Sequence, residues 1–379
     1  MTRSQKIIFN FLSIVALGLV VAIVWLYKTK WQTPLGPPLQ IPPQTQIPLA
    51  ATWTPDPLGA SSSLNAASNL TPALPASTSD ATCSSQKVMF LLLIGSDSRG
   101  DSYRYGLADM IRIARVDFVN ENVMVLEFPR DLWVQIPDIA DNLNGQDHEK
   151  LNQAYLYGNP GFHYTTDPAQ GPGLLARTLA LNFGARSDHY AAVNMRTFVN
   201  VVNAVGGIDV YLPEPVDGRT AEDLSERLLF PAGKLHLMGD RALTLARIRI
   251  KGGFARAENQ NRVLCALRDQ LASPKTIEKI PALIKSFQDN VQTDLSPEQI
   301  SQLACLGARM ESSDIRFVDF PEDLFDVTRE YDAVFNKEIS VVKTDFDVLR
   351  EYVTKFNDGS WDSSNSGTEG SHTEVSICP

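Results

Sequence analysis

An uncharged apolar run near the N-terminus constrains this chain more than any other feature. Residues 7–27 read IIFNFLSIVALGLVVAIVWLY and contain no charged side chain. A helix of this length, rising about 1.5 Å per residue, reaches roughly 30 Å, which is the thickness of a bilayer core. The run is apolar on every side, whereas a helix at the surface of a globular protein is amphipathic. We therefore predict a transmembrane helix here.

The basic residues that flank this run indicate its orientation only weakly. Arg3 and Lys6 precede it and Lys28 and Lys30 follow it, so the positive-inside rule favours neither side strongly. Because the N-terminal tail is short, we expect a single-pass protein of the cell membrane with its C-terminal part extracytoplasmic. A cleavable signal peptide is the alternative, but it has a shorter apolar stretch and a small-x-small cleavage site. The run here ends in VWLY and is followed by Lys28, which offers no such cleavage site.

Composition divides the chain into four segments. Residues 1–30 form the predicted cytoplasmic stub and transmembrane anchor. Residues 31–84 are rich in Pro, Ser and Thr and hold 10 of the 23 prolines, which favours an extended, disordered stalk. Residues 85–355 carry the patterns of a folded domain with a C-terminal extension. Residues 356–379 are polar and of low complexity, and we predict a disordered tail.

The net charge of −10 argues against general nucleic-acid binding, which needs a basic face. Four cysteines are present, and none forms a CxxC pair, so a zinc or redox motif has no support. Cys265 and Cys305 lie in helical patterns, whereas Cys83 and Cys378 lie at the edges of the folded region. An exported domain permits disulfides. We predict that Cys265 pairs with Cys305 and that Cys83 pairs with Cys378. Free thiols or a single bridge are the alternatives.

The folded region alternates between strand and helix patterns. It begins with residues 87–95, a continuous apolar run ended by glycine, which is typical of a buried strand. Further strands are predicted over 109–117, 122–128, 189–193, 208–212 and 315–320, and helices over 173–183, 195–205, 240–247, 259–271 and 297–309. Ser296 is a suitable N-cap for the last helix, with Pro297 at its first position. The pattern predicts an α/β fold of the α+β-like kind, with a mixed central β-sheet covered by helices on both faces.

Two aspartates stand at the ends of predicted strands. Asp97 lies in GSDSRGD directly after the first buried strand, where α/β sheets bind ligands, and Asp109 begins the strand DMIRIARV. Two carboxylates at one place suit Mg²⁺ (or Mn²⁺), which takes one or two carboxylates together with phosphate oxygens. A plain loop and a solvated aspartate are the alternatives. The segment matches neither a nucleophile elbow nor a P-loop.

Basic residues stand at another strand end and in one window of the sequence. Arg130 follows the strand NVMVLEF, and the window 240–269 reverses the sign of the overall charge. Within it, Arg247 and Arg249 share a side if the backbone is extended, and Arg256 and Gln260 share a face if it is helical. Arginine forks bind phosphate oxygens, so this set predicts a pyrophosphate site. A surface turn and a solvated basic helix face are the alternatives.

Several segments together resemble the LytR-CpsA-Psr family. They are FLLLIGSDSRGD, ADMIRIARVD, VLEFPRDLWVQIP, KLNQAYLYG, DHYAAVNMRTFVNVVNAVGGIDVYLPEP, FPAGKLHLMGDRALTLARIR and FARAENQNRVLCAL. The resemblance runs from about residue 88 to residue 271, and an N-terminal anchor accords with it. It implies an enzyme that moves a glycopolymer from polyprenyl (undecaprenyl) pyrophosphate to a cell-wall acceptor such as peptidoglycan.

The resemblance also assigns roles to individual residues. Asp97 and Asp109 match the metal carboxylates, and the pyrophosphate-binding residues match Arg104, Arg130, Arg247, Arg249, Arg256 and Gln260. Of these, we expect Asp97, Arg130, Arg247 and Arg249 to take part in catalysis. Asp131 matches a position whose role is structural. We hypothesise a Mg²⁺-assisted phosphoryl transfer, with the prenyl tail between the sheet and the helices at 195–205 and 173–183.

The chain departs from the family pattern at one basic position. Asn259 stands where the second Arg of R-x-x-R-Q is expected. In one interpretation, the neighbouring Arg262 supplies the missing positive charge. Losing one charge-assisted contact matters by roughly 1.5–3 kcal/mol. Two alternative functions follow: an envelope protein that binds polyprenyl phosphates without catalysis, and a pyrophosphate hydrolase.

Overall fold

The computed structural model describes residues 27–41, 83–98, 103–248, 253–273, 291–332, 336–361 and 375–378. Nearly all of the predicted transmembrane run lies outside these residues. None of the helices in the described ranges combines the length and apolar character needed to cross a membrane. The predicted site residue Arg249 also lies outside them, and the side chain of Arg256 is not described.

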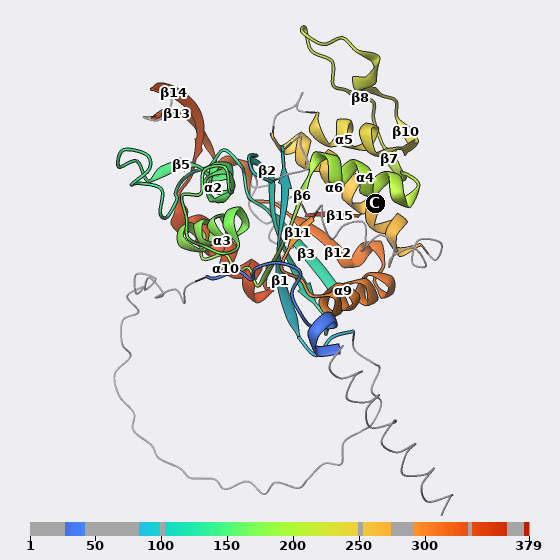
Figure 1. Cartoon of the computed structure of the whole chain (residues 1–379). Helices are drawn as coiled ribbons and strands as arrows, with labels where there is room; N and C mark the ends of the chain where they lie inside the picture. Colours follow the sequence, from blue (N-terminus) through green and yellow to red (C-terminus); the bar gives the residue numbers. More distant parts are fainter. Residues whose placement is uncertain are drawn as a thin grey trace, which may run out of the picture.

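A seven-stranded mixed sheet forms the centre of the molecule (Figure 1). Its order is β11-β6-β1-β2-β3-β12-β15. The β1–β6 and β3–β12 pairs are parallel, and the other four pairs are antiparallel. The strands are β1 (Val88–Ser96), β2 (Ala108–Asp117), β3 (Asn122–Glu127), β6 (His189–Asn194), β11 (Val291–Thr293), β12 (Ile315–Val318) and β15 (Val375–Ile377).

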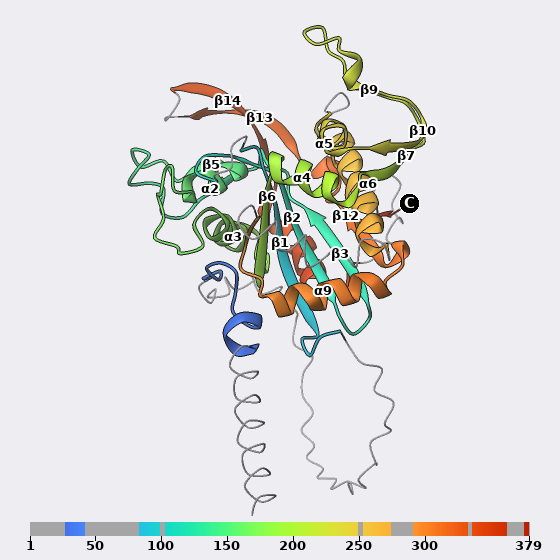
Figure 2. The ribbon, with the colours of Figure 1, turned by 45° about the vertical axis from the view of Figure 1, so that its right-hand side comes forward.

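Helices cover both faces of this sheet, which confirms the predicted arrangement (Figures 1 and 2). One face carries α2 (Leu151–Gly158), α3 (Gln170–Phe183) and α10 (Phe346–Asp358). The other face carries α4 (Met195–Val205), α5 (Gly239–Arg247), α6 (Gly253–Ala272) and α9 (Pro297–Arg309). Ser296 and Gln299 form a capping box at the start of α9, as the sequence predicts for the N-cap.

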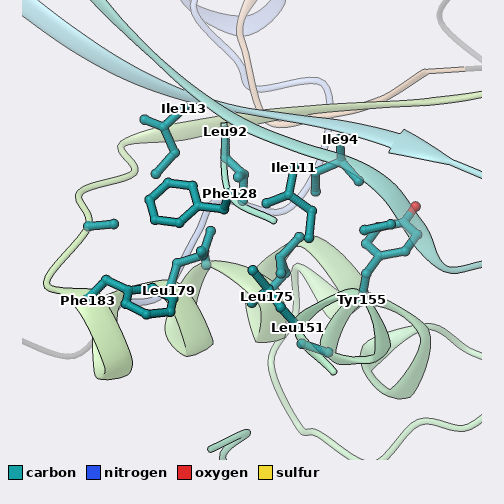
Figure 3. Close-up of a cluster of buried hydrophobic side chains, with 14 of the residues drawn as sticks. Leu92, Ile94, Ile111, Ile113, Phe128, Leu151, Tyr155, Leu175, Leu179 and Phe183 are labelled. Atoms are coloured by element: carbon teal, nitrogen blue, oxygen red, sulfur yellow. The ribbon is translucent and has the colours of Figure 1, made fainter. Parts of the chain in front are cut away.

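The alternation of side chains along β1 explains why both faces need a cover. Phe90, Leu92 and Ile94 belong to the core on the α2 and α3 side, and Met89 and Leu91 belong to the core under α6 and α9. Successive strand residues point to opposite faces of the sheet, so a strand that is apolar throughout must be buried on both faces. Figure 3 shows the first of these cores, in which side chains of β1 and β2 pack against α2 and α3.

Two-stranded antiparallel pairs lie outside the central sheet. The sequence patterns predict only one of their strands, β7. The pairs are β4 (Trp133–Gln135) with β5 (His148–Lys150), β7 (Ile208–Leu212) with β10 (Gly233–Leu237), β8 (Val216–Asp217) with β9 (Leu229–Phe230), and β13 (Asp326–Asp332) with β14 (Lys337–Lys343). The β13–β14 hairpin contacts the segment after β3: the N–H of Val342 donates to the carbonyl of Asp131 at 2.9 Å.

The boundaries predicted for the stalk and the tail need correction. Residues 31–41 of the predicted stalk lie against the domain: the N–H of Leu35 donates to the carbonyl of Leu295, and Leu39 and Ile41 pack on the core. At the other end, α10 continues to Asp358 and Trp361 is buried. β15 then pairs with β12, so the end of the predicted tail is part of the sheet.

The predicted cysteine pairing is wrong. Cys83 bonds to Cys305 in α9, and Cys265 in α6 bonds to Cys378 after β15. The prediction paired the two edges of the folded region with each other. However, those edges adjoin β1 and β15, which lie four strand spacings apart, or about 19 Å. A disulfide needs Cα atoms within about 7 Å, so each edge bonds instead to the helix that covers it.

Candidate functional site

A β-bulge at the start of β2 aims an aspartate into the site. Gly95 pairs with Met110 and Ser96 pairs with Ala108, so Asp109 is the extra residue. Without the bulge, Asp109 would lie on the opposite face from Met110. With it, both side chains line one pocket, while Ala108 stays in the core on the other side. Bulges re-aim side chains in this way next to many active sites.

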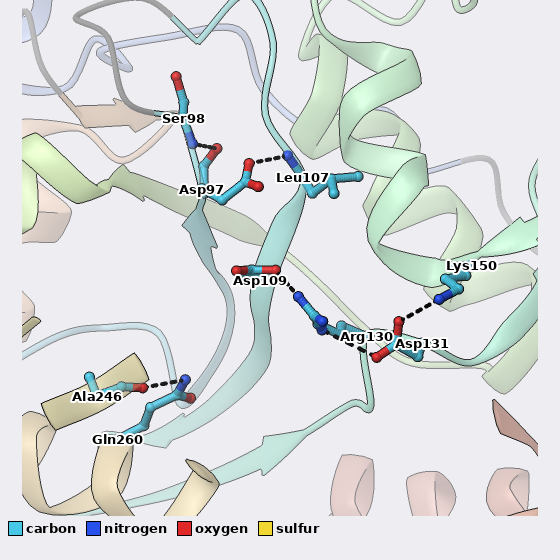
Figure 4. A network of polar contacts seen from close by, with 10 residues as sticks. Asp97, Ser98, Leu107, Asp109, Arg130, Asp131, Lys150, Ala246 and Gln260 are labelled. Atoms are coloured by element: carbon cyan, nitrogen blue, oxygen red, sulfur yellow. Dashed lines mark hydrogen bonds and ion pairs between the residues drawn. The ribbon is translucent and has the colours of Figure 1, made fainter. Parts of the chain in front are cut away.

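The segment after β1 places the second candidate, Asp97, at the end of the strand next to the one that carries Asp109 (Figure 4). The Asp97 carboxylate accepts the N–H of Leu107 at 2.7 Å, and the N–H of Asp97 donates to the carbonyl of Leu107 at 3.0 Å. These bonds close the loop between β1 and β2. Asp97 and Asp109 therefore stand at the ends of neighbouring antiparallel strands, as the sequence predicts.

Arg130, which follows β3, links Asp109 to Asp131. Its Nη1 donates to Asp109, and its Nε donates to Asp131 at 3.2 Å (Figure 4). Asp131 also accepts from Nζ of Lys150 at 3.0 Å, which fits the structural role expected for it. Burial alone would lower the pKa of Arg130, but the carboxylates of Asp109 and Asp131 outweigh it and raise this pKa. The guanidinium therefore stays charged and fixed.

Arg112 in β2 is the charged residue that the sequence patterns did not identify. It is 1% exposed and pairs with Glu127 across the β2–β3 ladder. It also donates to Asn261 at 2.5 Å and to Gln260 at 3.3 Å. The available signal was an arginine between two isoleucines near the middle of the strand. A buried charge needs such partners because desolvation is costly.

An apolar pocket of about 250 Å³ opens beside this polar cluster. β1, β2 and β6 form one wall, and α4, α5 and α6 form the other. Its lining is chiefly aliphatic, with Phe198 as the aromatic member. Three functional candidates line it as well: Asp109, Arg247 and Gln260. The predicted tail site next to α4 is thus matched by a pocket, but α3 lies on the opposite face of the sheet and is not part of it.

The structure brings together most of the described candidates. Arg247 ends α5 with an exposed side chain, and Gln260 donates to the carbonyl of Ala246 at 3.3 Å. Arg104 is exposed in the loop between β1 and β2, and its carbonyl accepts the N–H of Gly161. Arg262 forms an ion pair with Glu258, so the proposed compensation for Asn259 would have to break this pair.

Among the described residues, no group of three or more His, Cys, Asp or Glu side chains could hold a metal ion. Asp97 and Asp109 are a pair, and Mg²⁺ in proteins usually takes only one or two carboxylates, with the remaining positions filled by phosphate oxygens and water. The chemistry of these two oxygen donors fits that ion when a phosphate-bearing substrate supplies the other ligands.

Two buried carboxyl groups lie behind Asp131 and Lys150. Glu149 in β5 is fully buried, accepts from Gln146 at 2.7 Å and Gln153 at 3.2 Å, and shares a hydrogen bond with Asp332 of β13. Burial raises the pKa of Glu149 to about 7, and the neighbouring Asp332 carboxyl adds to this rise. A hydrogen bond between these two carboxyl groups needs a proton on one of them, and the raised pKa of Glu149 favours that proton.

The comparisons with known proteins identify the family of this chain. The LytR_cpsA_psr family matches residues 60–347, and the chain belongs to this family. One curated relative is the polyisoprenyl-teichoic acid–peptidoglycan teichoic acid transferase TagV of Bacillus subtilis, 30% identical over 213 residues, which are 55% of this chain and 50% of TagV. The matched region thus spans half the length of that relative.

Solved structures show the same fold. The crystal structure of B. subtilis TagV has a TM-score of 0.54 and 24% identity, and the match covers 72% of this chain and 98% of TagV. A structure of TagT bound to LIIa-WTA has a TM-score of 0.53 and 18% identity, over 72% of this chain and 91% of TagT. At these identities the likeness concerns the fold alone.

We predict that Arg112→Ala lowers the free energy of unfolding by about 3–5 kcal/mol, because it leaves the Glu127 carboxylate without its partner. The double variant Arg112→Met with Glu127→Leu should recover most of this loss. Urea denaturation of the three proteins measures the difference. Arg329→Ala, at an exposed pair with Glu338, is the control and should change stability by at most about 1 kcal/mol. Equal losses in the single and double variants would contradict the pairing.

A second prediction concerns pH. The pKa of Glu149 is about 7 in the folded protein against an ordinary 4.5, so its contribution to stability is fully present below pH 4.5. It is lost as the pH rises through 7, by on the order of 3 kcal/mol at most. Glu149→Gln should remove this dependence. Thermal unfolding of both proteins across this range tests it, and identical pH profiles would refute the raised pKa.

Proposed function

We propose that this protein transfers a glycopolymer from a polyprenyl pyrophosphate carrier to a cell-wall acceptor such as peptidoglycan, as a phosphotransferase-type ligase. One observation carries the proposal: an apolar pocket whose rim holds Asp109, Arg247 and Gln260, with Arg130 fixed against Asp109. A ligand that is a hydrocarbon at one end and a polyanion at the other suits such a site. The related transferase TagV, named for a polyisoprenyl-linked substrate and peptidoglycan, supports the same assignment.

The pocket provides the binding energy for the prenyl chain. Each CH₂ group that leaves water is worth about 0.8 kcal/mol, so even a short isoprenoid segment gains several kcal/mol there. Phe198 and Val201 of α4 and Val263 and Leu267 of α6 face the sheet across this space. The rigid helices fix where the chain ends, and thereby where the phosphates begin.

The arginines bind the pyrophosphate in this proposal. Arg130 supplies a charge that Asp109 and Asp131 hold in place, Arg247 supplies an exposed charge beside the pocket, and Gln260 can donate an amide N–H. Arg104, Arg249 and Arg256 remain candidates from the sequence. Guanidinium groups that are already oriented stabilise the extra charge of the transition state without reorganising. Asp131 and Lys150 act through Arg130 by holding its side chain in place.

Asp97 and Asp109 would hold Mg²⁺ or Mn²⁺. When bound, such an ion neutralises charge on the phosphate oxygens. The acceptor hydroxyl attacks the sugar-side phosphorus and forms a new P–O bond. The phosphoanhydride P–O bond breaks, and polyprenyl phosphate leaves with the electron pair. Asp97 is the candidate to accept the hydroxyl proton, because the N–H of Leu107 orients its carboxylate at the strand end.

The proposed location is the outer side of the cell membrane, with a single-pass anchor in residues 1–30. Two disulfides within the folded domain support an oxidising, extracytoplasmic compartment. The membrane would also supply the polyprenyl substrate. The overall negative charge keeps nucleic acid outside the set of expected partners.

A capture protein that binds polyprenyl phosphates without turning them over is the second candidate. It is favoured by Asn259, which is buried next to Gln260 where the family pattern carries an arginine, and by the engagement of Arg262 with Glu258. A pyrophosphate hydrolase would use the same residues, with water in place of the sugar hydroxyl.

The test is turnover by the full chain in detergent micelles on a short-chain prenyl pyrophosphoryl oligosaccharide, with Mg²⁺ and with or without peptidoglycan fragments. We expect sugar to appear on the fragments, and Asp97→Ala and Arg130→Ala to lose about 10²–10³-fold in rate. Arg329→Ala, an exposed arginine on β13, is the matched control and should retain full activity.

The other outcomes separate the alternatives. Release of sugar phosphate without transfer would identify a hydrolase. Tight lipid binding without cleavage would identify a capture protein, and Asn259→Arg would then test whether one guanidinium restores turnover. Full turnover by both site variants would contradict the proposed mechanism.

A further inference from the structure

Four aromatic side chains form a cluster outside the apolar pocket. Tyr105 meets Phe162 edge to face with ring centroids 5.9 Å apart, and Phe162 meets Tyr157 and Tyr164 at 5.6 and 5.4 Å. Tyr157 is 2% exposed and anchors the cluster in the core, whereas Tyr105 and Phe162 are 55% and 39% exposed. Two large aromatic side chains therefore form an exposed ledge on a rigid base.

Residues 103–107 connect this ledge to the site. The hydroxyl of Tyr103 donates to the carbonyl of Ala192 at 3.2 Å and accepts the N–H of Asn194, which caps α4 at the pocket wall. At the other end, Leu107 is bonded to Asp97. Consecutive Cα atoms are 3.8 Å apart, so the Cα of Tyr105 lies within about 7.6 Å of that of Leu107. The ledge is thus continuous with the rim of the site.

The chain is built to allow this close contact. The N–H of Gly161 donates to the carbonyl of Arg104 at 2.9 Å, which ties the loop after α2 to residues 103–107. A Cβ atom at Gly161 would overlap the ring of Tyr105 and that same carbonyl. Any larger residue would displace the aromatic ring, so the glycine is needed for the ledge to exist.

We propose that Tyr105 and Phe162 bind the sugar ring that carries the sugar-side phosphate of the donor. This inference rests on the proposed function and names a subsite of the same site. The prenyl chain occupies the apolar pocket beyond Asp109, and the pyrophosphate lies at the rim. The next group along the substrate then leaves the rim toward residues 103–107, where Arg104 and Tyr105 are both exposed.

The chemistry of the ledge suits a sugar better than more hydrocarbon. The face of an aromatic ring is electronegative and attracts the polarised C–H groups of a pyranose, while the hydroxyls at the edge of the sugar remain in water. An exposed ring offers such a face, whereas a lipid chain gains more from the enclosed pocket. Arg104 would contact the phosphate while Tyr105 contacts the attached ring.

The experiment compares two lipids with the full chain in detergent micelles. They are geranylgeranyl pyrophosphate and geranylgeranyl pyrophosphoryl N-acetylglucosamine, and affinity is measured by isothermal titration. We expect Tyr105→Ala to weaken binding of the sugar-bearing lipid about 5- to 10-fold and to leave the sugar-free lipid unchanged. Gly161→Ala should act in the same direction, and Tyr105→Phe should bind as the natural protein does.

Tyr331→Ala is the matched control, since Tyr331 is 58% exposed on β13, and it should alter neither affinity. Equal weakening of both lipids by Tyr105→Ala, or no change in either, would overturn the sugar subsite. In the turnover assay with peptidoglycan fragments, a rise in KM for the fragments alone would also overturn it, because the aromatic ledge would then bind the acceptor. If the natural protein bound neither lipid, the proposed function itself would fail, which the first three outcomes do not imply.

Discussion

The ion pair between Asp109 and Arg130 is the interaction on which the rest of the site depends. A bulge turns Asp109 out of the sheet's regular alternation, and the end of β3 brings Arg130 against it. Asp131 and Lys150 hold the arginine from behind, and β13–β14 reaches the same point through the backbone of Asp131. Residues from separate strands thus meet at one ion pair, Asp109–Arg130, beside an apolar pocket.

The two ends of this site obey different physics. Burying hydrocarbon between the sheet and α4, α5 and α6 gains free energy in proportion to area, without directional contacts. Binding a polyanion requires charges that are fixed and only partly desolvated, because full burial would cost more than pairing returns. Arg112 shows the limit, since it is buried and its two terminal nitrogens are bonded to Glu127, Gln260 and Asn261. Arg247, which is exposed at the end of α5, retains its capacity to bind a ligand.

Local patterns were sufficient for the elements that have strong periodicity or caps. The helix at Met195–Val205 ends at Gly206, as the pattern predicts, and the helix at Pro297–Arg309 begins at its predicted cap, Ser296. The patterns predicted β7 but missed β15 and the other hairpin strands, most of which have only two to five residues and so carry little pattern of their own. Asp97, Asp109 and Arg130 were identifiable from their places at strand ends.

Long-range features could not be derived in the same way. Cysteine pairing depends on the order of the strands and on which helix covers them, and no local pattern encodes either. Arg112 looked like an ordinary strand residue until Glu127 was placed opposite it. The aromatic ledge requires residues 103–107 to meet the loop after α2, a contact that depends on Gly161 and on the packing of Tyr157.

The most direct measurement is a crystal structure of the full chain with geranylgeranyl pyrophosphate and Mg²⁺. The account predicts the isoprenoid between β6 and the pair α4 and α6, with its phosphates within hydrogen-bonding distance of Arg130 and Arg247. An isoprenoid bound on the α3 face of the sheet, or phosphates remote from Arg130, would contradict it.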